Sequence, residues 1–431
     1  MAAEINPEER RQGNVRKPIL LNKIEGCPDT INEAIIIPKE DGVISVSDDK
    51  TLRVWLKRDS GQYWPSICHS MTSEASCVNY NPETRRLFVG QDNGTISEFE
   101  ITEDYNRLIH RRDYIAHQSR VTSVKFCLSW ESVLSCGKDK YFMWHCSETG
   151  RRFCGYQANA MCLCLEYDEQ SKYVFIGDYS GQVAVLKLKD SSFDFIVTLK
   201  GHAVSFLNFR RDLSKTPSPG LSTLRLLIGL GSIRCLSWDP DKQLLFSGSF
   251  DQSVIVWDIG GRKGTAFELQ GHKDKVQGLA HSKSTRQLLS GSDDCVLGIW
   301  DMDVQRLETP DWIESDVCQR CDSPFFWNFR KMWSDRKVGI RQHHCRNCGK
   351  ALCNNCCSKL STIPNMGYEY EVRVCDSCFD AITPEEKAPH ATFHDMKHSI
   401  VHMHLDETRK ILLTTGKDRV MKLWDMSLVL H

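Results

Sequence analysis

The chain has 431 residues, enough for two or three domains of ordinary size, and 41% of them are hydrophobic, as expected for a globular protein with a sizeable core. The formal net charge is −1 at pH 7, so bulk charge does not make the chain a binder of nucleic acid or membranes, and any anion site must be local. The sequence has neither the apolar core of a signal peptide near Met1 nor a run long enough to span a bilayer, which predicts a cytoplasmic protein.

The 20 cysteines are unevenly distributed along the chain. Nine of them lie between Cys318 and Cys378, and the others are scattered. In a reducing compartment clustered cysteines indicate metal ligands rather than disulfides. The scattered cysteines are interpreted as small buried hydrophobic residues.

A repeat occupies nearly all of the chain outside residues 311–390. Each unit has a short apolar strand, a turn that contains Asp or Gly, and a second strand that ends in an aromatic or large apolar residue. These end residues are Trp55, Phe99, Trp144, Leu186, Trp257, Trp300 and Trp424. Most of them are spaced by about the 40–45 residues that are typical of WD repeats, and two of the gaps are longer.

The pattern resembles the WD-repeat β-propeller family, in which each unit is a four-stranded blade. We therefore expect an all-β, seven-bladed propeller, with the first six blades in residues 17–310 and the last blade in residues 391–427. In that family an aspartate of the turn joins a hydrogen-bond network with a histidine from a Gly-His pair and with the Trp. The corresponding aspartates are Asp49, Asp251, Asp294 and Asp418, and the histidines are His117, His202 and His272. Asp139 lies one residue closer to its Trp, which predicts an altered network in the third unit.

Two further segments bear on the propeller. The apolar run in residues 17–26, KPILLNKIEG, is expected to supply the missing outer strand of the last blade and so to join the two ends of the chain. Residues 203–230 lengthen one of the gaps between repeats. They lack blade patterning, and without them the ordinary period returns. We expect a dispensable loop there, with a partner-binding loop as the alternative.

Residues 311–382 contain four Cys-x-x-Cys pairs. The pairs are Cys318/Cys321, Cys345/Cys348, Cys353/Cys356 and Cys375/Cys378. Because this spacing lets both sulfurs face one ion, the eight thiolates predict two tetrahedral zinc sites, which are closed and therefore structural rather than catalytic. Cys357 is predicted not to be a ligand.

Three short motifs lie beside these pairs: Trp312 to Asp316 (WIESD), Arg341 to Arg346 (RQHHCR) and Arg373 to Cys375 (RVC). They resemble the signature elements W-x-x-D, R-[RK]-H-H-C-R and R-V-C of FYVE fingers. A FYVE finger inserted before the last blade further resembles the family of WD-repeat and FYVE-domain-containing proteins. The chain departs from the pattern at two places, because Gln342 replaces a second base and Ser315 holds the place of the acidic residue, which is displaced to Asp316.

The resemblance implies that the finger binds phosphatidylinositol 3-phosphate. The residues that it assigns to the headgroup are Arg341, His343, His344, Arg346 and Arg373. Independently, residues 330–359 contain eight Lys or Arg and only one acidic residue, Asp335, which is a concentrated anion site in a near-neutral protein. In FYVE fingers the segment before the basic motif enters the bilayer, and here Val338 and Ile340 would form its apolar tip.

These features predict a non-enzymatic adaptor on the early endosome membrane, with proteins bound on the propeller faces and homodimerisation left open. For the aromatic residues from Phe325 to Phe329 and Trp333 we expect packing between finger and propeller, with a second membrane contact as the alternative. A RING-like ubiquitin ligase is the second hypothesis, although RING fingers usually have a histidine ligand. Nucleic-acid binding is the weakest, since neither a recognition helix nor a stacking platform is evident.

Overall fold

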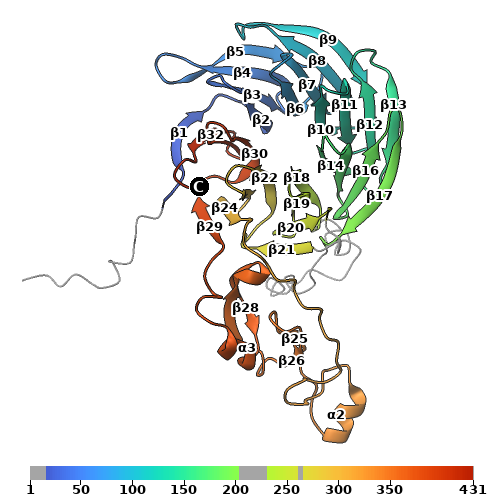
Figure 1. The fold of residues 1–431 in the computed structure, drawn as a ribbon, viewed down its shortest axis with the longest axis vertical. Coiled ribbons are helices and arrows are strands. Elements are labelled where there is room, and N and C mark those ends of the chain that lie inside the picture. Colours follow the sequence, from blue (N-terminus) through green and yellow to red (C-terminus); the bar gives the residue numbers. More distant parts are fainter. Residues whose placement is uncertain (1–15, 203–230, 261–265, 431) are drawn as a thin grey trace, which may run out of the picture.

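The computed structural model describes residues 16–202, 231–260 and 266–430, which form a ring of seven four-stranded blades with a small finger hanging from one side (Figure 1). All strand pairs within the blades are antiparallel. The predicted seven-bladed propeller is therefore confirmed. The segment 203–230 lies outside the described residues, but its flanks do not: the carbonyl oxygens of His202 and Gly231 both approach Gly181, so the two flanks lie close together.

The blades follow the chain order. Blade one contains β2 (Ile31–Ile36), β3 (Gly42–Ser47), β4 (Thr51–Lys57) and β5 (Tyr63–Ser70). Blade two contains β6 (Ala75–Asn81), β7 (Arg86–Gln91), β8 (Thr95–Ile101) and β9 (Leu108–Ile115). Blade three contains β10 (Val121–Cys127), β11 (Ser132–Gly137), β12 (Tyr141–Cys146) and β13 (Arg152–Gln157). Blade four contains β14 (Cys162–Tyr167), β15 (Tyr173–Asp178), β16 (Gln182–Leu188) and β17 (Phe193–Lys200).

The remaining blades have the same four-stranded form, but blades six and seven each take their outer strand from a distant part of the sequence. Blade five contains β18 (Ile233–Asp239), β19 (Leu244–Ser249), β20 (Ser253–Asp258) and β21 (Ala266–Gln270). Blade six contains β22 (Val276–Ser282), β23 (Gln287–Ser292), β24 (Val296–Asp301) and β29 (Ala391–Asp395). Blade seven contains β30 (Ile400–Asp406), β31 (Ile411–Gly416), β32 (Met421–Asp425) and β1 (Ile19–Ile24).

The ring closes where β1 pairs with β32, antiparallel, with Leu20 opposite Trp424 and Ile24 opposite Met421. This confirms the closing strand expected in residues 17–26. The placement of β29 corrects the expected range of the last blade. Residues 391–395 pair with β24 and complete blade six, so the finger is inserted within that blade, before its outer strand.

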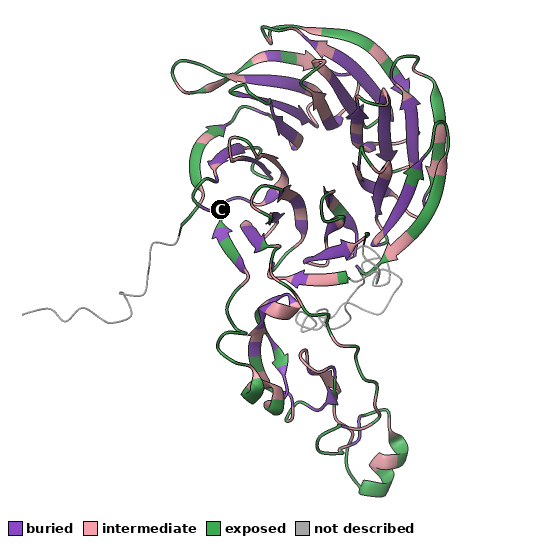
Figure 2. Cartoon of the chain, in the orientation of Figure 1, coloured by how far each residue is buried: buried purple, intermediate pink, exposed green. Residues whose placement is uncertain are grey.

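The core lies between neighbouring blades. The second and third strands of most blades are buried on both faces, as in β3, all of whose residues are buried, whereas the fourth strands are largely exposed at the rim (Figure 2). Ile44 and Val46 of blade one share a cluster with Leu87 and Val89 of blade two. Runs of β-branched residues suit strands that are packed on both sides, so each blade is stabilised by the next rather than by itself.

The turn between the second and third strands of each blade contains a residue with positive φ. These residues are Lys50, Gly94, Lys140, Gly181, Gln252, Cys295 and Arg419. The two glycines belong to the two repeats that lack a Trp. A Cβ at Gly94 would lie 2.1 Å from the backbone oxygen of His117, and one at Gly181 would lie 2.3 Å from that of His202. In these two blades the backbone at His117 or His202 therefore passes so close to the turn that a side chain at the glycine would not fit.

The histidine networks are present as expected in blades five and six, and blade seven has one whose histidine was not predicted. In blade five His202 lies 2.9 Å from Asp251 and 2.7 Å from the Ser247 hydroxyl, which also accepts a 2.8 Å hydrogen bond from the Trp257 indole. His272, Asp294, Ser290 and Trp300 repeat this arrangement in blade six. In blade seven the histidine is His398, beside Thr414, Trp424 and Asp418. The search for Gly-His or Ala-His pairs missed it, because Lys397 precedes it.

Two blades depart from that network. In blade three His117 still pairs with Asp139, at 3.0 Å, but the Trp144 indole donates to Ser132 and not to the serine beside the histidine, so the predicted alteration is found. In blade one Asp49 pairs with Arg53 at 2.8 Å instead of with a histidine. The expectation for Asp49 was thus wrong, because Arg53, the third residue of β4, takes the place of a histidine as the partner of Asp49.

Candidate zinc centres and anion site

The finger has few regular elements. It contains α2 (Phe329–Asp335), β25 (His343–His344), β26 (Ala351–Leu352), β27 (Lys359–Ile363), the 3-10 turn η2 (Pro364–Met366), β28 (Tyr368–Val374) and α3 (Asp376–Ala381). Strands β25 and β26 form one small antiparallel pair, and β27 and β28 form another. Cysteines make up much of the finger's buried cluster, which suits a domain whose folding energy comes largely from metal.

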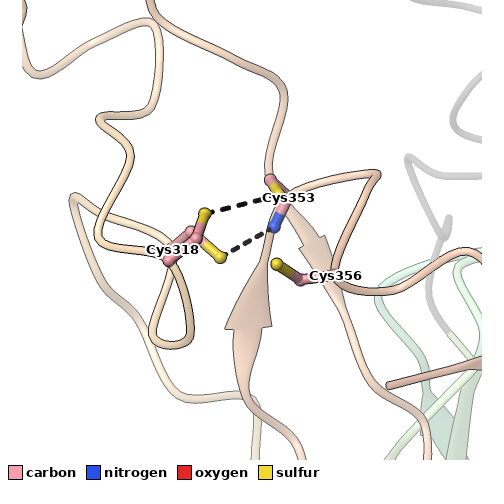
Figure 3. A group of neighbouring side chains, drawn as sticks. Cys318, Cys353 and Cys356 are labelled. Atoms are coloured by element: carbon pink, nitrogen blue, oxygen red, sulfur yellow. Dashed lines mark hydrogen bonds between the residues drawn. The ribbon is translucent and has the colours of Figure 1, made fainter. Parts of the chain in front are cut away.

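The eight paired cysteines gather into two groups. One contains Cys318, Cys321, Cys353 and Cys356, and the other contains Cys345, Cys348, Cys375 and Cys378. The first and third pairs of the sequence therefore share one site, and the second and fourth pairs share the other. Figure 3 shows the sulfur atoms of Cys318, Cys353 and Cys356 converging on one point.

The spacing of the thiols fits zinc. Four sulfurs at about 2.3 Å from a central ion in a tetrahedron are about 3.8 Å apart. The sulfur–sulfur distances are 3.8 Å between Cys321 and Cys353, and 4.0 Å between Cys348 and Cys375. Backbone amides also support the sulfurs, since Cys353 donates to Cys318 at 3.3 Å and Cys375 donates to Cys345 at 3.2 Å. The donor set is thus that of two closed structural zinc sites.

Neither group includes a histidine among the described residues, so the RING-type ligand set is not formed there. Cys357 also stands outside both groups. Its side chain is buried in the finger core, burial raises the pKa of its thiol to about 12, and its carbonyl accepts a 3.1 Å hydrogen bond from Arg373. A buried protonated thiol in this position is a core residue, as expected from the sequence.

Two of the five predicted headgroup residues lie against Trp312. The His344 ring stacks on the indole, with centroids 4.7 Å apart and planes tilted by 12°, and its Nε2 lies 3.3 Å from the carbonyl oxygen of Ile313. The Arg346 guanidinium lies 4.7 Å from the centroid of the same indole. Because the side chains of His344 and Arg346 share one aromatic platform, their polar ends are held in a fixed relation. The sequence identifies Trp312 as a motif residue, but this stacking role could not be predicted from it.

The other three lie close to one another. The pKa of His343 is lowered by burial and by the neighbouring positive charges of Arg373 and Arg341. Arg373 is oriented by a 2.9 Å hydrogen bond to Asn354, and its carbonyl oxygen accepts a 3.0 Å bond from the Arg346 amide. That backbone bond ties the two basic motifs together. The electrostatics are those of a cationic site without a protein anion to neutralise it: among the described residues none of Arg341, His343 or Arg373 has a carboxylate partner.

The two departures from the FYVE pattern have structural roles. Gln342 donates a long, 3.4 Å hydrogen bond to the carbonyl oxygen of Ser315, and the Ser315 hydroxyl donates to the carbonyl oxygen of Val317 at 2.8 Å. The Asp316 carboxylate accepts a 2.9 Å bond from the Trp327 indole. Asp316 is therefore engaged in positioning the aromatic segment and not in the basic site.

The predicted membrane tip is only partly exposed. Val338 is 85% exposed, in agreement with an insertion role. Ile340, in contrast, packs against the finger core, and its amide donates a 3.0 Å bond to Pro324. Its assignment to membrane insertion needs correction, because leaving the core would open the finger.

The aromatic segment also differs from expectation. Phe325 is buried within the finger, but Phe329 is 73% exposed and Trp333 is 89% exposed, on helix α2 at the end of the finger that is farthest from the propeller (Figure 1). The expected packing against the propeller was therefore wrong. The junction is formed instead by the edges of two sheets: β21 of blade five meets β28, with Gln270 opposite Tyr368, and the Gln270 amide donates to Gly367 at 2.8 Å.

This junction brings blade five close to the basic site. Burial raises the pKa of Glu268, and the charge of Arg346 acts on both that carboxyl and the Tyr368 hydroxyl. A Cβ at Gly367, whose φ is +83°, would lie 2.0 Å from the backbone oxygen of Glu268. The turn between η2 and β28 therefore has to be glycine for the sheets to meet.

Comparisons with known proteins agree with this division of the chain. Residues 311–384 match the FYVE zinc finger family, and residues 223–258 and 264–301 match the WD domain, G-beta repeat. The crystal structure of the WD40 propeller domain of Doa1 is similar with a TM-score of 0.57 over 95% of this chain and 97% of that one, at 14% identity, which bears on the fold alone. The described part of the chain has no helix long and apolar enough to cross a membrane.

Relatives match over nearly the whole length. WD repeat and FYVE domain-containing protein 2 is 56% identical in Mus musculus and 55% identical in Homo sapiens, over 99% of this chain and 99% of each relative. The protein of the same name in Caenorhabditis elegans is 37% identical over 99% of this chain and 97% of its own length. The chain therefore belongs to the family of WD repeat and FYVE domain-containing proteins.

Proposed function

We propose that the protein is a membrane-recruited scaffold whose finger binds phosphatidylinositol 3-phosphate on early endosomes and whose propeller binds other proteins. The observation that carries this proposal is the cationic site of the finger, in which Arg341, His343, His344, Arg346 and Arg373 are gathered beside two zinc centres. A phosphomonoester has nearly two negative charges and several acceptor oxygens, which arginines satisfy with paired donors.

The arrangement favours a bound headgroup over a structural role for these charges. A structural guanidinium normally has a carboxylate partner, as Arg320 has in Asp376. The guanidinium of Arg346 instead lies over an aromatic ring, and that of Arg373 is held by neutral acceptors. Donors that are oriented but not neutralised are suited to an incoming anion. The exposed Val338 would add contact with the apolar part of the bilayer.

The propeller has the geometry of a binding scaffold. Its centre contains a cavity of about 570 Å³, lined by inner-strand residues of all seven blades and carrying charged groups such as Glu33, Lys125 and Arg234. Glu33 accepts a bond from the Val78 amide, and Lys125 pairs with Glu166 at 3.0 Å. Because Glu33 and Lys125 already have partners inside the ring, we assign protein binding to the outer faces and loops of the blades.

The experiment that tests this proposal compares three variants of the full-length protein. Arg346→Gln, and His343→Gln with His344→Gln, remove basic groups of the site. Lys283→Gln removes one exposed charge from the propeller and is the matched control. Binding to phosphatidylinositol 3-phosphate vesicles should fall about tenfold or more in the first two variants, because charge-assisted bonds are lost, and should not change in the control.

Endosomal localisation of the same variants in cells should follow vesicle binding. The melting temperature and zinc content must match those of the wild type. If a variant that passes both checks still binds vesicles and marks endosomes normally, the lipid site is not where we place it.

A further inference from the structure

The inner strands of the blades begin at the same end of the ring as the turns between the second and third strands. In each blade a backbone hydrogen bond joins the two, as where the Phe250 amide donates to Ser232 at 3.0 Å and the Asp92 amide donates to Glu74 at 2.9 Å. We call this ring of turns and strand starts the turn rim. It surrounds one end of the central cavity, which has a volume of about 570 Å³.

Three carboxylates of the turn rim already have cationic partners. The guanidinium of Arg120 lies 3.3 Å from the carboxylates of both Asp48 and Asp92. Asp293 pairs with the ammonium group of Lys417 at 2.7 Å. These parts of the rim are therefore neutralised from within the chain and do not favour a further cation.

Three bases of the turn rim, in contrast, have no carboxylate partner among the described residues: Lys138, Arg234 and Lys275. Lys138 and Arg234 line the cavity. The three bases belong to blades three, five and six, whose inner strands β10, β18 and β22 stand with β14 around one side of the opening (Figure 1). The excess positive charge is thus gathered on one side of the rim.

The ring of Phe250 holds two of these bases in place. The Arg234 guanidinium lies 5.2 Å from its centroid, and the Lys275 ammonium group lies 4.7 Å from it. Solvent reaches Arg234, but the crowding by the channel walls lowers the pKa of its guanidinium, because the charged form loses part of its hydration. An anion that reaches this group would stabilise its charge. The two bases are therefore oriented and lack a counter-ion.

We propose that the turn rim binds an acidic segment of a partner protein, whose carboxylates pair with Lys138, Arg234 and Lys275. The charge of the rim identifies the partner, since bases that are spread over neighbouring blades suit several carboxylates along one extended chain. This proposal rests on the proposed function, in which the propeller binds proteins through its faces and loops, and it names the kind of protein segment that is bound.

The chain's own segment 203–230 is not suited to occupy the rim. Its flanks lie close together at Gly181, which belongs to the turn of blade four. The segment contains four bases, at positions 210, 211, 215 and 225, and only one acid, Asp212. Because like charges repel, this composition would add to the positive charge of the rim instead of neutralising it.

The test measures binding of the full-length protein to a fluorescent glutamate-rich peptide and to the same peptide with glutamine at every glutamate position. The wild type should bind the glutamate peptide about tenfold or more tightly than the glutamine peptide. Arg234→Gln with Lys275→Gln should remove most of this preference. The matched control, Lys39→Gln with Lys283→Gln, removes two exposed bases from turns at the opposite end of the blades and should match the wild type.

Two further measurements separate a lost contact from a damaged fold. Arg234→Lys keeps the charge, so it should retain most of the affinity for the glutamate peptide, with the melting temperature of the wild type. The affinity of the wild type for the glutamate peptide should also fall steadily as sodium chloride is added, because salt screens exposed charges. This second measurement needs no variant.

The outcomes are distinct. Equal binding of the two peptides by the wild type, or affinity that salt does not change, would overturn the proposal. So would equal losses in the rim variant and its control, which would show that any exposed base serves. Selective loss of single-stranded DNA or phosphatidylserine vesicles from the rim variant, without a preference for the glutamate peptide, would assign the rim to another class of partner.

Vesicles that contain phosphatidylinositol 3-phosphate distinguish this proposal from the proposed function. The rim variant should bind them as the wild type does, because the finger is unchanged. A wild type that prefers the glutamate peptide but ignores these vesicles would sink the headgroup site and leave the rim standing. A wild type that binds the vesicles but not the glutamate peptide would sink the rim alone.

Discussion

Trp312 illustrates how one residue organises the basic site. Its indole contacts both His344 and Arg346, so it orients two headgroup residues without itself carrying charge. The Trp of the W-x-x-D motif could be recognised from the sequence, but its stacking role could not. The residues that it contacts lie more than 30 positions away, and a backbone hydrogen bond of 3.0 Å from the Ile313 amide to the Gly349 carbonyl oxygen holds the two segments together.

We predict that Trp312→Ala weakens binding to soluble inositol 1,3-bisphosphate about three- to tenfold, because His344 and Arg346 lose the platform that holds them. Trp312→Phe should keep most of the affinity, since a phenyl ring can still stack. Isothermal titration of the full-length protein measures both. The account would be contradicted if the alanine variant, folded and with its zinc retained, bound as tightly as the wild type.

At the scale of elements, the finger depends on metal and the propeller does not. Four of the zinc-site cysteines belong to the finger's buried cluster and three more pack against it, so much of this cluster depends on the metal sites. Each interface between blades, in contrast, has an apolar core of its own. The two parts meet mainly through one sheet edge. Loss of a zinc site should therefore be local.

We expect elemental analysis of the purified protein to give two zinc ions per chain. Cys375→Ser should lose about one of them and abolish binding to phosphoinositide vesicles, while the main thermal transition, which belongs to the propeller, remains. Cys357→Ala is the control and should retain both ions, because Cys357 is outside both groups. A zinc content that fell equally in the two variants would mean that Cys357 is a ligand.

The pairing of β1 with β32, which closes the propeller, can be tested separately. Ile24 on β1 is 1% exposed and packs in the cluster that joins blades seven and one, whereas Leu21 on the same strand is 47% exposed. Ile24→Ala should therefore cost about 2–5 kcal/mol of unfolding free energy, and Leu21→Ala about 0.5 kcal/mol or less. Chemical denaturation compares them. Equal small effects would show that β1 does not close the ring.

At the scale of the whole molecule, buried histidines make the stability of the propeller depend on pH. Burial lowers the pKa of His145 and His404 to about 4, below the value of 6.5 that they regain on unfolding. Between about pH 6.5 and pH 4 the unfolded chain therefore binds more protons than the folded chain. Their contribution to stability is complete above this range and is lost as the pH falls through it.

We predict that the melting temperature of the protein falls between pH 7 and pH 5, and falls less in His145→Phe. The substitution keeps an aromatic ring against Tyr114, whose ring centroid is 5.7 Å from that of His145, but removes the titrating group. Calorimetry across this pH range measures the difference between the two proteins. Parallel pH profiles would rule out His145 as a source of the effect.

Most of the fold could be predicted from the repeat period, the turn aspartates and the four cysteine pairs, because each is a local pattern with a fixed spacing. The outer strand of blade six could not be assigned this way: β29 begins at Ala391, long after its partner β24 ends at Asp301, and its own sequence has no distinguishing pattern. Helix α2 was missed for a physical reason as well. Its apolar face is turned toward solvent, so the usual link between apolar periodicity and burial does not hold there.

The central claim is that the finger recognises the 3-phosphate of a membrane phosphoinositide. The most direct measurement is binding of the full-length protein to vesicles that differ only in which phosphoinositide they contain. The set of vesicles covers every phosphorylated form of phosphatidylinositol. The account predicts the tightest binding to phosphatidylinositol 3-phosphate and competition by soluble inositol 1,3-bisphosphate. Equal binding to every phosphoinositide, or binding that the soluble headgroup does not reduce, would contradict it.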